Sequence, residues 1–201
     1  MRRANMTVTG STRFSALGGH RVLDLINTVD WRLDPARRGE RLADVSAVWD
    51  WGLEFGYLTA NEHDRLTTEL SDASTDAWEG ILGLREQTYE VLFDEPTSDR
   101  ARQRLDETFR VALDACVLTR TASGWAQLET ELHLSTLRHR IARDVMAFAT
   151  TTPADRLRQC ADDACGWVYL DTSPRLNRLW CSSASCGNRN RARRHYQRSR
   201  S

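Results

Sequence analysis

Apolar residues recur at intervals of three, four and seven positions from Phe14 to about Ala149. This spacing puts them on one side of a helix, the pattern of an amphipathic helix buried along one face. Each stripe predicts one helix. The stripes are Val22, Leu25, Ile26 and Val29; Val45, Val48 and Trp49; Trp78, Ile81, Leu82, Tyr89, Leu92 and Phe93; Leu105, Phe109, Ala112, Leu113 and Cys116; and Leu134, Leu137, Ile141, Val145 and Phe148.

Two further helices are predicted from their first residues. Thr59 precedes Glu62 by three positions, a capping-box pattern that predicts a helix through Leu70. Thr152 followed by Pro153 is typical of a helix start, and we expect that helix to lead to the first cysteine of the C-terminal part.

The helical rhythm stops between residues 117 and 128, where we expect a short β-hairpin with Gly124 in its turn. The predicted fold class is therefore mostly α. We expect a helical body of five to seven helices over residues 14–150 and a small C-terminal module over residues 153–201.

Four of the five cysteines lie in two pairs within 27 residues: Cys160, Cys165, Cys181 and Cys186. Two pairs separated by a short insert can bring four thiolates to one tetrahedral zinc ion. Ordinary buried cysteines, a disulfide or an iron–sulfur site are the alternatives. Four thiolates fill the shell of zinc, so one structural Zn²⁺ is predicted and metal catalysis is not. Cys116, on a helical stripe, is expected to be a core thiol.

The residues around the second cysteine pair suggest the shape of this module. Residues 166–173 alternate β-formers and end in turn residues, and Leu179-Trp180 is expected to return as a second strand. The composition after Cys186 is helical and basic. This order predicts a treble-clef or zinc-ribbon-like finger.

Charge is distributed unevenly along a chain whose formal net charge is zero. All 28 basic residues are arginine. Residues 166–201 hold eight arginines and one acid, whereas residues 1–165 hold twenty arginines and twenty-seven acids. The pattern predicts an acidic body with a basic tail.

The basic tail is a candidate nucleic-acid interface. On a helix, arginines would lie on two roughly opposite faces, which suits a groove whose walls are phosphate. The alternatives are a solvated tail that balances the zinc–thiolate charge, docking onto the acidic body, or a protein or membrane partner. The predicted DNA contacts are Arg189, Arg191, Arg193, Arg194, His195 and Arg198.

Several strings in the finger, in order, resemble the CGNR zinc finger family of bacterial proteins. They are Gly166-Trp167, Leu170-Asp171-Thr172-Ser173, Trp180-Cys181-Ser182, Cys186-Gly187-Asn188-Arg189 and Ala192-Arg193-Arg194-His195-Tyr196. The N-terminal strings Leu17-Gly18-Gly19-His20 and Leu23 to Trp31 resemble the start of the ABATE domain that accompanies this finger. The resemblance implies a mostly helical body, the four cysteines as zinc ligands and a proposed role as a stress-linked transcription regulator.

His20, Asp24 and Asn27 lie three to four residues apart on a predicted helix. They are expected either to line a polar pocket, to meet the finger, or simply to act as caps and surface residues. A pocket there would make a small-molecule effector possible. The body would then sense a signal, or it would form a homodimer.

Other function classes find little support in the sequence. No stretch approaches the roughly 20 apolar residues of a membrane span. No apolar segment follows the basic first five residues, so we expect no signal peptide and a cytoplasmic protein. No nucleophile motif, phosphate loop or catalytic carboxylate pair is present, which favours binding over an enzyme. The leading prediction is a DNA-binding regulator; the alternatives are a zinc-stabilised protein interaction module and a ligand-binding protein or enzyme with its site in the body.

Overall fold

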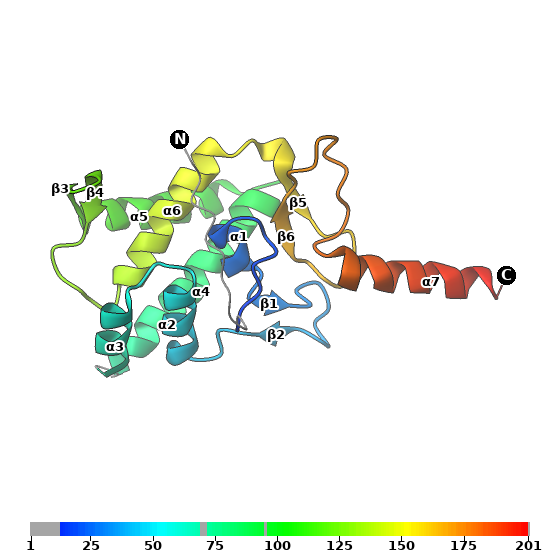
Figure 1. Ribbon diagram of the computed structural model, residues 1–201, viewed down its shortest axis with the longest axis horizontal. Helices are drawn as coiled ribbons and strands as arrows, with labels where there is room; N and C mark the ends of the chain where they lie inside the picture. Colours follow the sequence, from blue (N-terminus) through cyan, green and yellow to red (C-terminus); the bar gives the residue numbers. More distant parts are fainter. Residues whose placement is uncertain (1–12, 69–71, 95, 201) are drawn as a thin grey trace.

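The computed structural model describes residues 13–68, 72–94 and 96–200. A helical body and a small cysteine-containing finger lie side by side within these ranges, and the C-terminal helix extends away from both (Figure 1). The first five residues and the expected helix end at Leu70 lie outside the described residues.

Six of the helices described form the body, which confirms the mostly α prediction. They are α1 (Arg21–Ile26), α2 (Val45–Glu54), α3 (Ala60–Thr68), α4 (Asp72–Phe93), α5 (Asp99–Asp114) and α6 (Thr136–Thr151). One core joins them, with Trp49, Trp51, Leu84 and Ile141 among its fully buried side chains. None of the helices described is long and apolar enough to cross a membrane.

Local hydrogen bonds set where the helices begin. The capping box before α3 is present: the Thr59 N–H donates to Glu62 Oε2 at 2.8 Å, and the Glu62 N–H donates to Thr59 Oγ1 at 3.3 Å. Asp44 caps α2 by accepting from the Ala47 N–H at 2.8 Å. Each cap satisfies an N–H that the first helical turn leaves free.

The predicted hairpin is present. Strands β3 (Val117–Thr121) and β4 (Gly124–Leu128) pair antiparallel. Gly124, with φ of +129°, directly follows the two-residue turn and opens β4. Leu118 and Trp125 are each 68% exposed, so the hairpin shows apolar side chains to solvent.

One helical prediction in the body is wrong at its end. Helix α1 stops at Ile26, and Val29 lies instead in strand β1 (Val29–Asp30), which pairs with β2 (Gly39–Glu40). Val29 is buried like the apolar residues of α1, and in so short a segment the spacing of apolar residues does not distinguish a strand from another helical turn.

The finger differs from its prediction in two segments, one before Cys160 and one before Cys181. Thr152 does not start a helix but ends α6, where its N–H donates to the Phe148 carbonyl at 2.9 Å. One 3₁₀ turn (Ala154–Arg156) leads into β5 (Leu157–Gln159), which pairs with β6 (Val168–Leu170). Leu179 forms no strand; its carbonyl accepts a single bond from the Ala161 N–H. A π-helical turn (Ser183–Gly187) then opens α7 (Asn188–Arg198).

Candidate metal centre and arginine helix

The four paired cysteines meet at one buried point of the finger. Their Sγ atoms all lie within 4.8 Å of one another. Two separations are 3.8 Å, between Cys165 and Cys181, and 3.5 Å, between Cys181 and Cys186. Zinc bonded to four sulfurs at about 2.3 Å gives sulfur–sulfur edges of about 3.8 Å. A disulfide needs about 2.05 Å, so the cluster fits one tetrahedral zinc and no disulfide.

These thiols cannot all ionise unless a cation sits between them. Contacts with the thiols of Cys165 and Cys181 lower the pKa of Cys160 to about 2. Contact with Cys160 raises the pKa of Cys165 and that of Cys181 above the ordinary thiol range. One thiolate therefore forms readily, and its charge opposes the next. A divalent ion removes this opposition, so the donor set suits one structural zinc with a complete shell.

Arg189 belongs to the metal centre. Its Nη2 donates to Cys186 Sγ at 2.9 Å, and its Nε donates to the buried carboxylate of Asp162 at 2.9 Å. The guanidinium also lies over the Trp31 ring, 4.5 Å from its centroid. A positive group beside the thiolates orients them and offsets their charge. The sequence places Arg189 among the DNA contacts, whereas the structure gives it partners inside the protein.

Asp162 and Trp31 were not among the residues predicted for this site. Asp162 lies within the loop between Cys160 and Cys165, where an acid can bond the turn, and its Oδ1 accepts from the Ala164 N–H at 3.2 Å. The sequence therefore contains a signal for Asp162, namely its position between two metal ligands. Trp31 comes from the body, far away in the chain, and no local pattern connects it with the cysteines.

Residues of the body hold the finger by hydrogen bonds to its backbone. The buried Asn27 side chain makes two 2.8 Å bonds with β6, one to the N–H and one to the carbonyl of Val168. The carbonyl of Cys165, a metal ligand, accepts from the Arg32 N–H at 3.0 Å. Val168 is itself fully buried in the core of the body. Finger and body therefore share one core, and the metal site is bonded directly to the body.

The three polar residues predicted to share a pocket have three different surroundings. The His20 Nδ1 caps α1 by accepting from the Val22 N–H at 3.2 Å, and its ring stacks on Phe148 with centroids 4.4 Å apart. Asp24 is buried and accepts from the Gly18 N–H at 2.7 Å; burial raises its pKa to about 7. Asn27 is the one that meets the finger. Of the three, only His20 lines the cavity at the junction of body and finger.

Helix α7 carries the other predicted DNA contacts and projects away from the body (Figure 1). Every residue from 191 to 200 is exposed. Arg191 Nη2 donates to the Ser183 carbonyl at 3.1 Å, and Arg193 lies 3.6 Å from the exposed carboxylate of Asp163. Arg191 also donates to Asn188 Oδ1 and has no acidic partner among the described residues, and the exposed Arg193–Asp163 pair is weak, so both positive charges remain available to a partner.

The side chains of the remaining predicted DNA contacts make even fewer interactions within the protein. Within the described residues, the side chains of Arg194 and His195 have no hydrogen-bond partner, and that of Arg198 makes only a 3.4 Å bond to the Arg194 carbonyl. The helix thus presents a dense cationic surface without acids of its own.

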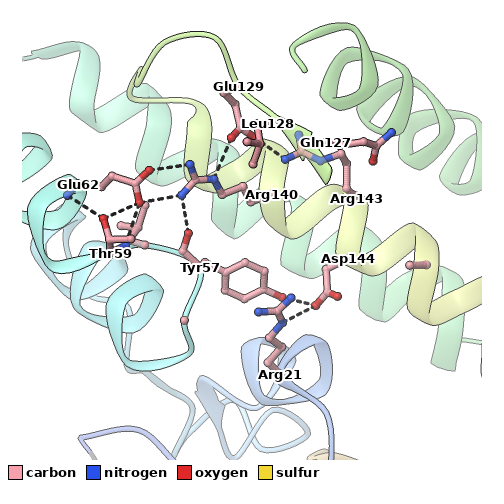
Figure 2. A pocket seen from close by; sticks show the side chains of 13 residues that line it. Arg21, Tyr57, Thr59, Glu62, Gln127, Leu128, Glu129, Arg140, Arg143 and Asp144 are labelled. Carbon is pink, nitrogen blue, oxygen red and sulfur yellow. Dashed lines mark hydrogen bonds and ion pairs between the residues drawn. The ribbon is translucent and has the colours of Figure 1, made fainter. Parts of the chain in front are cut away.

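The body contains a polar cavity of about 600 Å³ between α6, strand β4 and the segment before α3. Figure 2 shows that its arginines point toward acidic side chains. The pairs are Arg21–Asp144 at 2.8 Å, Arg140–Glu62 at 2.7 Å and Arg143–Glu129 at 2.5 Å. Because each cation is neutralised within the protein, this network ties the helices of the body together.

Two protein-family models match the chain. Residues 156–199 match the CGNR zinc finger. Residues 19–152 match ABATE, described as "Putative stress-induced transcription regulator". No curated protein matches the chain. The ABATE match covers more than half of the sequence, and the finger match contains all four buried cysteines and α7. The chain therefore belongs to the ABATE family and carries a C-terminal CGNR zinc finger.

Proposed function

We propose that this protein regulates transcription by binding DNA through α7, which the zinc site holds in place. The observation that carries the proposal is helix α7, which directly follows the turn that holds the metal ligand Cys186 and is exposed at every residue from 191 to its end at Arg198. Its contacts would be Arg191, Arg193, Arg194, His195 and Arg198.

A helix of this composition is not expected to be stable in isolation. Helices of about 12–15 residues or fewer are marginal in water, and like charges one turn apart destabilise them further. α7 has 11 residues and no buried side chain. A polyanion would relieve the repulsion, and arginine forks bond phosphate in a bidentate way. Duplex DNA supplies such phosphates on both sides of a groove that admits a helix.

In this proposal the protein binds and does not catalyse. A zinc ion with four thiolate ligands has no open position for water or substrate. Its role is to fold the finger and set the direction of α7. Four reduced cysteines reserved for a metal also favour a reducing compartment, and we place the protein in the cytoplasm.

The test is duplex binding by fluorescence anisotropy at several salt concentrations. Replacing Arg191, Arg193 and Arg194 with Ala removes three candidate phosphate contacts. Each contact contributes about 0.9 to the slope of log affinity against log salt, so the slope should become shallower by up to about 2.7. Affinity at low salt should fall with it.

The matched control removes the same charge from the body. Arg100, Arg110 and Arg120 are exposed and lie on α5 and β3. Replacing these three with Ala should leave the salt slope close to that of the parent. Equal binding by the α7 variant and the parent would show that α7 is not the DNA surface.

A protein-interaction role is the second candidate, and the exposed hairpin favours it. Leu118, Trp125 and Leu128 are 68%, 68% and 41% exposed. Exposed apolar side chains grouped on one element often mark a protein contact. If the α7 variant retains its DNA affinity, or if the parent binds no duplex, this reading becomes the better one.

A further inference from the structure

A second cavity lies where the body meets the finger. Its volume is about 660 Å³, within the range of small-molecule pockets. Its walls come from the residues just before α1, the end of α6, and the 3₁₀ turn and the end of β6 in the finger. We propose that this junction cavity binds a small organic anion of metabolite size, held by its carboxylate or phosphate group.

The cation for such a ligand is Arg156, in the 3₁₀ turn of the finger. Its Nη1 makes one long bond, 3.3 Å, to the Asp171 carbonyl. Within the described residues no carboxylate pairs with it. The rest of its planar fork is therefore available, and this fork matches the two oxygens of a carboxylate or phosphate.

The surrounding groups include donors that suit an anion with hydroxyl groups. Since His20 Nδ1 accepts a backbone N–H, the neutral ring carries its proton on Nε2, and no described residue accepts from that nitrogen. The hydroxyls of Thr152 and Thr172 also have no partner in the described part of the chain. Phe148 and Leu170 provide an apolar wall for the carbon skeleton.

The cavity in Figure 2 differs from the junction cavity in the state of its arginines. The two cavities share only Asp144 and Ala147 among their lining residues. In that cavity each of the three arginines already has a carboxylate within 2.8 Å. An anion entering it would have to compete with those acids. At the junction Arg156 has no acidic partner among the described residues. Asp144, which also lines this cavity, is already paired with Arg21 at 2.8 Å and accepts from the Tyr57 hydroxyl at 2.5 Å.

An anion at this place would contact both parts of the protein at once. His20 and Phe148 belong to the body, whereas Arg156 and Thr172 belong to the finger. A ligand that binds only the docked arrangement stabilises it. If α7 binds DNA as proposed, the bound anion acts as an effector: it holds the finger, and hence α7, in one position relative to the body.

Isothermal titration calorimetry on the zinc-loaded full chain tests the site without DNA. The probes are glucuronate, glucose 6-phosphate and glucose, which share a sugar ring and differ in the anionic group. We expect at least one of the two anions to bind with a stoichiometry of one, and glucose not to bind. The proposal is wrong if neither anion binds or if glucose binds as well as they do.

Three variants locate the binding. Arg156→Gln should weaken the anion about 10- to 100-fold, the usual effect of losing a charged hydrogen-bonding pair. Thr172→Glu, at an exposed position, should also weaken it by placing a carboxylate at the cavity. Arg175→Gln removes the same charge from an exposed part of the finger and should bind like the parent.

A fourth variant separates the cavity from the arginine helix. The protein with Arg191, Arg193 and Arg194 replaced by Ala should bind the anion with the affinity of the parent, whatever its DNA affinity. Loss of anion binding there, or full binding by Arg156→Gln with its thermal midpoint unchanged, would overturn the proposal. Neither result would decide whether α7 binds DNA.

Discussion

The arginines of the finger differ in what their side chains touch, although they look alike in the sequence. Arg189 bonds a metal ligand and a buried acid, whereas Arg193, one helical turn later, reaches only an exposed acid at 3.6 Å. Arg178 donates to the carbonyls of Trp180 and Cys181 and helps to shape the second cysteine loop. Composition predicts a basic surface here, but only partners show which cations are free to form it.

The first prediction follows from the position of Arg189. Arg189→Gln should lose zinc to a chelator faster than the parent, with an affinity lower by about 10- to 100-fold, because a group that orients the ligands is removed. A colorimetric zinc-release assay measures this. Arg193→Gln is the control, since it removes the same charge from the same helix; equal zinc release by the two variants would contradict the assignment.

A second prediction concerns buried Asp24, whose pKa is about 7 in place of its ordinary 3.8. The folded state keeps a proton that the unfolded state releases near pH 4. This contribution to stability is complete at pH 4 and is lost as the pH rises to 7.

Asp24→Asn stays neutral and can still accept from the Gly18 N–H. The variant should lack this pH dependence and be more stable than the parent above pH 7, by at most a few kcal/mol. Urea unfolding at pH 5 and pH 8 provides the comparison. The same fall in stability for both proteins between these pH values would count against a raised Asp24 pKa.

At the scale of elements, the long helices could be predicted because their periodicity extends over several turns. The α3 cap and the hairpin were also predictable, since both depend on residues only a few positions apart. The errors lie where the decisive contact is distant. Thr152 looks like a helix start, but α6 runs through Thr151. Strand β5 exists because it pairs with β6, a later segment of the chain, in a register that sets Gln159 opposite Val168 and Leu157 opposite Leu170.

The same limit applies to the candidate site. Paired spacing predicts the metal cluster, because four cysteines so arranged have few other uses. The docking role of Asn27 depends on Val168, which lies 141 residues away. Sequence spacing suggests a polar group in that region, and only the fold shows its partner.

The third prediction tests this junction between α1 and β6. Asn27→Ala leaves the buried N–H and carbonyl of Val168 without partners, at a cost of about 1–3 kcal/mol for each group. Chemical denaturation should show a loss of about 2–6 kcal/mol. Asn177→Ala, at an exposed position of the finger, should change stability little. A comparable small effect for both variants would mean that the Asn27 bonds do not hold the finger.

At the scale of the whole molecule, the two sequence modules are joined by shared packing and hydrogen bonds. Val168 of the finger is buried among body residues, and the Cys165 carbonyl is bonded to Arg32 of the body. The two family matches meet between residues 152 and 156, but the core does not divide there.

Removal of zinc should therefore destabilise the body as well as the finger. A loss of several kcal/mol lowers the thermal midpoint by at least about 10 °C in a chain of this size. Calorimetry should show one transition, and the fluorescence of buried Trp49 and Trp51 should change with it. An unchanged body transition after chelation would indicate that the two modules fold independently.

The exposed arginines of α7 have a consequence for how the cell can control this surface. The chain contains no lysine, so acetylation of lysine side chains, which removes their positive charge, has no target here. Without lysine acetylation, control would act instead on the position of the helix, for example through oxidation of the zinc thiolates or through the body to which the finger is bonded.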